Sequence, residues 1–307
     1  MRAVGRVAGL PARTAPDALL ARWLGLTAMS FTAVVVLFPF ERLRLELGGT
    51  VSTGVATAAL LGIQAYAALR GLHRVRDMAR WAFWGVLISA LYVLPMYAVA
   101  RAGLPFRDAL LRAADARTGV DVAAIVAFTR AHPWADRIST AAYESLPIGC
   151  IAALIVPPLA GSGERTRTLL GALALASVAT LAFYRAFRGI GPWEGYARMT
   201  PTMDQRACAD ACRALAAGGW FVVDLQRPDP LIAFPSWHAL LAALSAMALA
   251  RLPRARVAAW VWGSAVALST LTTGWHYAVD TIAGLALAAG CWALAKTLAR
   301  GRGGAGR

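Results

Sequence analysis

Phe234-Pro235-Ser236-Trp237-His238 opens one apolar run of the sequence, and Trp275-His276-Tyr277-Ala278-Val279-Asp280 opens another. Between them lie apolar residues 239–250, a basic turn at 251–256 and apolar residues 257–273. This order is typical of a hairpin of two membrane helices. The hairpin returns His276 to the face of the membrane from which His238 started.

The two histidines and Asp280 form a combination that suits covalent catalysis. His276 and Asp280 are spaced i, i+4, so on a helix the carboxylate would accept a hydrogen bond from one imidazole nitrogen. The other nitrogen would then act as the nucleophile, and His238 would donate a proton. Ser236 and the free amides at the start of its helix would bind an anionic oxygen. The alternative is that His276 belongs to an interfacial aromatic belt.

The two stretches resemble signature motifs of the type 2 phosphatidic acid phosphatase superfamily. Residues 234–238 are similar to the second motif, and Ser269, His276 and Asp280 are similar to the third. The Thr-Gly-x-His-Tyr-x-x-Asp arrangement at 273–280 resembles the branch that includes fungal inositol phosphorylceramide synthases. The likeness extends over roughly residues 100–290. It implies a phosphohistidine at His276, proton transfer by His238, and no metal ion or other cofactor.

The sequence departs from this family at the groups that hold the phosphate. Thr270 follows Ser269 where the phosphatases have arginine, and the lysine-containing first motif is absent, since the only lysine is Lys296. Arginine must therefore hold the phosphate, and its planar fork suits that role. The candidate substrate-binding residues are Ser236, Arg185, Arg188, Arg227, Ser269 and Thr270.

The composition is that of a polytopic membrane protein. Of 307 residues, 59% are hydrophobic and 15% are charged, which excludes an ordinary soluble domain. The net charge of +15 does not indicate nucleic-acid binding, because the arginines mostly flank apolar runs. We expect an all-α membrane helical bundle. Its partners would be the membrane and a lipid or polyprenyl phosphate; the oligomeric state is left open.

Eight apolar runs are long enough to be membrane helices. They cover residues 23–40, 47–69, 81–100, 139–160, 168–187, 231–250, 257–275 and 276–295. The predicted organisation is a basic tail at 1–22, two extra helices within 23–80, a six-helix catalytic domain at 81–295 and a second tail at 296–307.

The distribution of positive charge predicts the orientation. The two tails and the loops 70–80, 161–167 and 251–256 hold 17 of the 31 lysines and arginines. The positive-inside rule therefore places both termini in the cytoplasm. Because arginine and alanine are abundant, we expect a bacterial inner membrane, with the two histidines facing the periplasm.

Two longer segments are expected on the outer side. Residues 101–138 have the periodicity of short amphipathic helices at the interface. Residues 188–230 form either a lid over the substrate headgroup or a solvated connector. In that segment Cys208 and Cys212 form either a local disulfide or two free thiols. Glu144 either faces the site or lies away from it.

The sequence leaves three activities open. The motif variant favours transfer of a lipid-linked headgroup to another lipid, whereas many bacterial proteins with this pattern resemble simple lipid phosphate phosphatases. A third possibility is an ion-coupled transporter that uses Glu144, Arg185 and Asp280 as an ion path. Polar residues near one face, rather than at the midplane, favour the enzyme.

Overall fold

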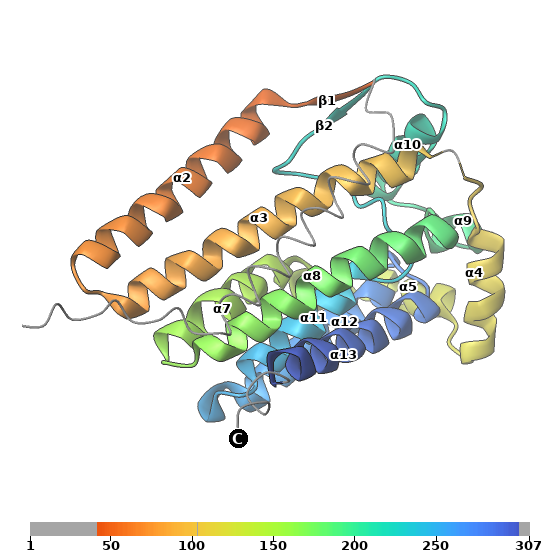
Figure 1. Ribbon diagram of the computed structural model, residues 1–307. Helices are drawn as coiled ribbons and strands as arrows, with labels where there is room; N and C mark the ends of the chain where they lie inside the picture. Colours follow the sequence, from red (N-terminus) through yellow and green to blue (C-terminus); the bar gives the residue numbers. More distant parts are fainter. Residues whose placement is uncertain (1–41, 103, 301–307) are drawn as a thin grey trace, which may run out of the picture.

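Helices form nearly all of the regular structure. The computed structural model describes residues 42–102 and 104–300 (Figure 1). Its elements are β1 (Leu43–Leu45), α2 (Leu47–Leu69), α3 (His73–Arg101), α4 (Asp108–Asp115), α5 (Val122–Ala131), α6 (Pro133–Glu144), α7 (Leu146–Leu159), α8 (Gly163–Ala186), α9 (Pro192–Gly195), α10 (Met203–Ala216), β2 (Phe221–Val223), α11 (Trp237–Leu249), α12 (Arg256–Thr272) and α13 (Ala278–Arg300). The predicted all-α helical bundle is confirmed. The predicted helix at 23–40 lies outside the described residues.

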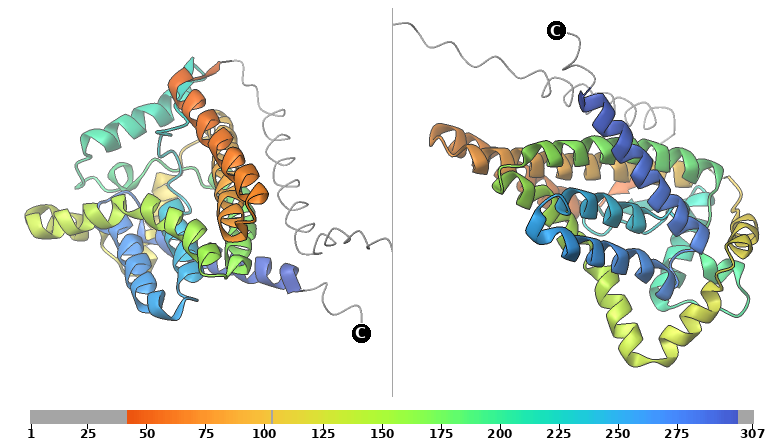
Figure 2. Two further views of the ribbon diagram at one scale, coloured as in Figure 1. Left: turned by 90° about the vertical axis from the view of Figure 1, so that its left-hand side faces the viewer. Right: turned by 90° about the horizontal axis from the view of Figure 1, so that it is seen from below.

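Six helices pack into the body of the molecule, and α11 lies at its centre. α11 contacts α7, α8, α12 and α13, while α3 packs against α7 and α8. α2 packs on α3, at the outside of this group (Figures 1 and 2). Buried alanines and leucines such as Ala242 and Leu244 fill the centre. Small side chains allow the helix backbones to approach closely.

Five stretches of the described residues are long and apolar enough to cross a membrane. They are Leu47–Leu69, His73–Arg101, Pro133–Leu159, Gly163–Ala186 and Ala278–Ala299. α11 has only 13 residues, which corresponds to about 20 Å at about 1.5 Å per residue. That is less than the roughly 30 Å of a bilayer core. The predicted helix at 231–250 was therefore too long.

The residues just before α11 and α13 explain where these two helices begin. Pro235 has no N–H to donate, and the Ser236 hydroxyl accepts a hydrogen bond from the N–H of Ala239 at 3.2 Å, so α11 starts at Trp237. Gly274 has a φ of 78°, which ends α12 in the left-handed conformation that glycine favours. α13 therefore begins at Ala278, and the prediction of a helix from His276 was wrong.

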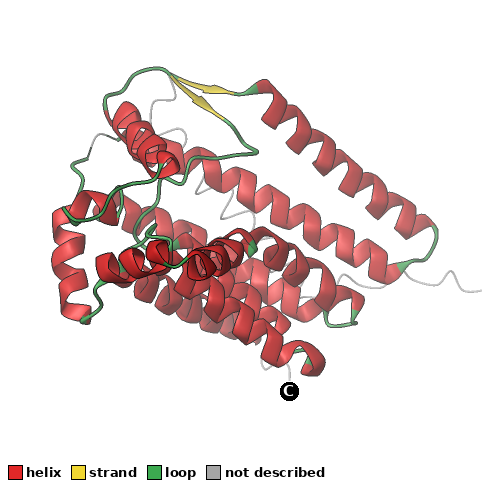
Figure 3. Cartoon of the chain, turned by 180° about the vertical axis from the view of Figure 1, so that it is seen from behind, coloured by secondary structure: helices red, strands yellow, loops and turns green. Residues whose placement is uncertain are grey.

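The shorter elements gather at one end of the bundle. α4, α5, α9, α10 and the strands lie together there (Figures 1 and 3). The amphipathic helices predicted within 101–138 are present as α4, α5 and the first part of α6. The parallel pair of β1 and β2, with Leu43 beside Phe221, was not predicted, because three residues are too few to give a periodic pattern.

The orientation of this bundle can be tested with impermeant thiol reagents. In a background lacking Cys208 and Cys212, we expect a cysteine at Met203, which is 86% exposed, to be labelled in intact spheroplasts. A cysteine at Arg254, in the turn between α11 and α12, should be labelled only after the membrane is opened. Labelling of Arg254→Cys alone would invert the orientation, and equal labelling of both would contradict the hairpin.

Candidate active site

His238 and His276 face each other at one end of the α11–α12 hairpin. His238 lies in the first turn of α11, and His276 lies in the turn between α12 and α13. The centres of their rings are 6.3 Å apart. The expected convergence of the two histidines is therefore present, although they are separated by 38 positions in the sequence.

The backbone holds the His276 ring in one orientation. Its Nδ1 lies 2.9 Å from the carbonyl oxygen of Ala233. A carbonyl oxygen only accepts hydrogen bonds, so Nδ1 carries the proton and Nε2 keeps its lone pair. The N–H of His276 also donates to the carbonyl of Thr270 at 3.1 Å. The ring is thus fixed from both sides of the hairpin.

Asp280 supports the same turn, but it does not accept the hydrogen bond from His276 that the i, i+4 spacing predicted. Its Oδ2 accepts a hydrogen bond from the N–H of Tyr277 at 2.8 Å and lies 3.6 Å from Nδ1 of His276. Asp280 is the third residue of α13, so its bond to Tyr277 is one half of a capping box. The acceptor of the His276 hydrogen bond is therefore the carbonyl of Ala233, and the carboxyl group of Asp280 lies beside it.

Aromatic side chains enclose the two histidines. Tyr143 stacks on His238 with ring centres 4.2 Å apart, and its hydroxyl lies 3.4 Å from Nδ1 of that histidine. Trp275 lies beyond Tyr143, at 6.4 Å between ring centres. Trp275 was quoted in the sequence only as the residue before His276. No local pattern could have shown that Tyr143, from α6, stacks on His238.

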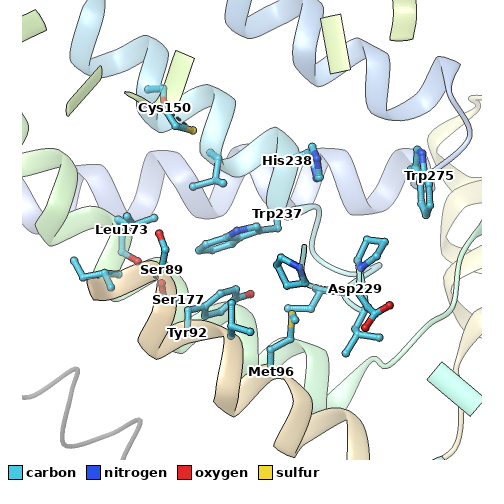
Figure 4. Close-up of a pocket in the computed structure, with 18 of the residues that line it drawn as sticks. Ser89, Tyr92, Met96, Cys150, Leu173, Ser177, Asp229, Trp237, His238 and Trp275 are labelled. Atoms are coloured by element: carbon cyan, nitrogen blue, oxygen red, sulfur yellow. Dashed lines mark hydrogen bonds between the residues drawn. The ribbon is translucent and has the colours of Figure 1, made fainter. Parts of the chain in front are cut away.

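A cavity of about 320 Å³ opens from the histidines into the bundle. His238 and Trp275 lie toward one end, Trp237 and Tyr92 lie in the middle, and other lining residues continue past them (Figure 4). Cys150, Leu173, Ser89 and Ser177 lie at the far end, and most of the lining residues are apolar (Figure 4). Among the described residues, the lining contains no lysine or arginine, and its one carboxylate is Asp229.

The three predicted hydroxyl ligands of the phosphate are hydrogen bonded within the protein. The buried Ser236 caps α11. Ser269 donates to the carbonyl of Val266 at 2.7 Å. Thr270 lies 2.8 Å from the hydroxyl of Thr281, across the contact between α12 and α13. None of these three side chains lines the cavity.

The three predicted arginines also lie outside the cavity lining. Arg188 is 1% exposed, and its guanidinium donates to the carbonyls of Leu104 and Cys212 at 3.1 and 3.2 Å. It thereby ties the segment before α4 to α10. Arg185, in the last turn of α8, and Arg227, just before the second motif, are exposed. Glu144 is exposed as well and does not line the cavity.

The segment 188–230 packs on the turn between α12 and α13 instead of connecting helices through solvent. Gln205 of α10 is fully buried, and its amide donates to the carbonyls of Thr273 and Gly274, both at 3.2 Å. Trp193 packs edge-to-face on Trp275 with ring centres 5.5 Å apart. The sequence left open whether Cys208 and Cys212 form a disulfide or are free thiols. Both are buried free thiols of α10.

Two buried aspartates of α4 lie near the same turn. Asp108 accepts hydrogen bonds from the N–H groups of Ile190 and Gly191, each at 3.0 Å. Burial raises the pKa of Asp108, and these backbone hydrogen bonds partly offset that effect. Asp115 is 0% exposed. No local pattern in the sequence indicates these roles, because the side-chain partners of the two aspartates lie 81 or more positions away.

Comparison with known proteins gives the family. A family model described as the PAP2 superfamily matches residues 109–294, which is more than half of the chain and includes both histidines and Asp280. The chain belongs to the PAP2 superfamily. No curated protein and no solved structure matches the chain significantly.

Family membership defines the general activity. Members of the superfamily are phosphatases or phosphotransferases, so the protein is an enzyme, and lipid phosphates and membrane association are implied. This finding favours the enzyme over the transporter. Glu144 and Arg185, two residues of the supposed ion path, are also exposed on the outside of the bundle.

Proposed function

We propose that the protein is a membrane phosphoryl-transfer enzyme that forms a phosphohistidine at His276 from a lipid phosphate or phosphodiester. The observation that carries the proposal is the pair of facing histidines at the end of a mostly apolar cavity. One histidine suits attack on phosphorus and the other suits proton transfer. The cavity suits the hydrocarbon part of the substrate.

The proposed reaction has two balanced steps. In the first, Nε2 of His276 attacks phosphorus, the bond from phosphorus to the leaving oxygen breaks, and that oxygen takes a proton from His238. In the second, water or an alcohol loses its proton to His238 and attacks the phosphohistidine. The phosphorus–nitrogen bond then breaks and restores both histidines. The hydrogen bond from Nδ1 to Ala233 supports this scheme, because it leaves Nε2 available.

Asp280 would stabilise the positive charge that develops on the His276 ring. Its Oδ2 is 3.6 Å from Nδ1, close enough for a strong attraction in a site shielded from water. Charge on the phosphoryl oxygens also needs stabilisation. Arg188 already binds two carbonyls, so Arg185 and Arg227 remain the proposed arginines, although neither lines the cavity.

The cavity supports a substrate with a hydrocarbon chain. Along α3 its lining runs from Met96 to Gly85, a distance of about 16 Å at about 1.5 Å per residue. This is close to half of the roughly 30 Å hydrocarbon core of a bilayer. A chain of one leaflet would therefore fit along α3 with its phosphate at the histidines.

Filling the cavity tests this assignment. Ser89 lines the cavity and is exposed, so Ser89→Trp should enter it without disrupting the packed core. Displacing two or more methylene groups, at about 0.8 kcal/mol each, should raise KM for a long-chain lipid phosphate roughly tenfold. Hydrolysis of water-soluble phenyl phosphate should be unchanged. Ala182→Trp, at an exposed position of α8 outside the lining, is the matched control.

The acceptor decides between transferase and phosphatase. We favour headgroup transfer, as in the inositol phosphorylceramide synthase branch, because Thr270 replaces the phosphatase arginine. Hydrolysis of a lipid phosphate is the second candidate. Purified protein given a lipid phosphodiester and a lipid alcohol should form a new phosphodiester. Release of inorganic phosphate from a lipid phosphate, with no transfer product, would establish the phosphatase instead.

A further inference from the structure

The start of α13 is bound by a carboxylate from another helix. Oδ1 of the fully buried Asp115 accepts a hydrogen bond from the N–H of Val279 at 2.9 Å. Its Oδ2 accepts one from the hydroxyl of Tyr196 at 2.7 Å. Val279 is the second residue of α13, and N–H groups in the first turn have no partner within the helix. Asp115 therefore caps α13 from α4.

A second carboxylate of α4 binds the residue next to His276. Oδ1 of Asp108 accepts a hydrogen bond from the hydroxyl of Tyr277 at 3.3 Å, in addition to the two backbone N–H groups of the 188–230 segment. The Tyr277 hydroxyl also lies 3.0 Å from the carbonyl oxygen of Gly191. Tyr277 is fully buried. Its position is thus fixed through both its ring and its hydroxyl.

The two residues held by these contacts, Tyr277 and Val279, lie between His276 and Asp280 in the sequence. Tyr277 follows His276 directly, and Val279 precedes Asp280 directly. Because neighbouring residues share a backbone, a shift of Val279 moves Asp280, and a shift of Tyr277 moves His276. A misplacement of about 1 Å in an active site can cost on the order of 100-fold in rate.

We infer that Asp115 and Asp108 are positioning residues that hold the catalytic turn 275–280 in its reactive geometry. The inference rests on the proposed function, since it assigns these carboxylates a role in the reaction at His276. It gives α4 a function beyond the predicted one of lying along the membrane interface. It also explains the burial of two carboxylates, which is costly unless hydrogen bonds satisfy them.

The test compares two substitutions of Asp115 in the purified full-length protein. Asp115→Ala removes the acceptor for Val279 and should lower kcat on the order of 10- to 100-fold, with KM for a long-chain lipid phosphate unchanged. Asp115→Asn keeps a side-chain oxygen for Val279 and should restore most of the activity. The thermal unfolding midpoint in detergent is measured for both variants.

Asp121→Ala is the matched control. Asp121 is an acceptor of the same kind at the start of α5, where its Oδ1 accepts from the N–H of Ala124 at 3.0 Å. Its loss should lower stability without lowering kcat. Wild-type kcat in Asp115→Ala, the same loss of kcat in Asp121→Ala, or no rescue by asparagine would overturn the inference. Full activity of His276→Ala would instead overturn the proposed function, so the two failures are distinguishable.

Discussion

Replacing His276 with alanine is expected to abolish turnover of every phosphate substrate. The variant loses the atom that forms the bond to phosphorus, and removal of a catalytic nucleophile typically costs on the order of 10⁵-fold or more in kcat. The protein should remain folded, because the other groups of the turn, such as Asp280 and Tyr277, keep their hydrogen bond to each other. The measurement is phosphate release or headgroup transfer by purified protein in detergent.

Asp280→Asn is the comparison for this experiment. An asparagine oxygen still accepts from the N–H of Tyr277, but the negative charge near His276 is lost, so the loss of activity should be much smaller than in His276→Ala. Wild-type protein quenched during turnover should also carry acid-labile phosphate, and His276→Ala should carry none. Substantial turnover by His276→Ala would rule out this residue as the nucleophile.

Replacing His238 with alanine is expected to have an effect that depends on the leaving group. A positioned general acid contributes roughly 10²- to 10⁴-fold, so turnover of a lipid phosphate with an alkoxide leaving group should fall by this amount. A p-nitrophenyl leaving group needs no proton, and phosphorylation of His276 by such a substrate should be nearly normal. The decisive quantity is the ratio of the two single-turnover rates.

Two contacts between His238 and Tyr143 suggest a control for this experiment. His238 stacks on Tyr143, and the hydroxyl of that residue lies 3.4 Å from Nδ1 of His238. Tyr143→Phe keeps the stacking but removes the hydroxyl, so it separates the contribution of that hydroxyl from the contribution of His238 itself. Equal losses on both leaving groups in His238→Ala would contradict its role as the general acid.

The sequence could predict those features that depend on residues near each other in the chain. The apolar runs predicted a helical membrane protein because a helix satisfies its own backbone hydrogen bonds and needs only enough apolar residues to cross the bilayer. The basic turn at 251–256 predicted the α11–α12 hairpin, and the two motifs predicted the superfamily. The all-α fold and the family are confirmed, while the branch and the roles of individual residues stay predictions.

The apolar pattern alone did not predict the residues at which the helices begin. Hydropathy continues through residues 231–236 and through Trp275, yet α11 starts only at Trp237 and α13 only at Ala278. Pro235 and Gly274 are visible in the sequence, and they carry the signal for these boundaries. Because His276 lies before α13, its spacing from Asp280 does not have the helical geometry that we assumed.

The hydrogen-bond partners of the residues in and around the candidate site follow from the packing of the helices. Local patterns predicted the two histidines, the hairpin that joins them and the membrane setting. The partner of His276 is a carbonyl 43 positions away, at Ala233, and Asp115 reaches Val279 across 164 positions. Arg188 has the chemistry of a phosphate ligand but is buried against carbonyl groups. The physical reason is that a side chain's partners depend on which helices pack together, whereas local patterns record only which helices form.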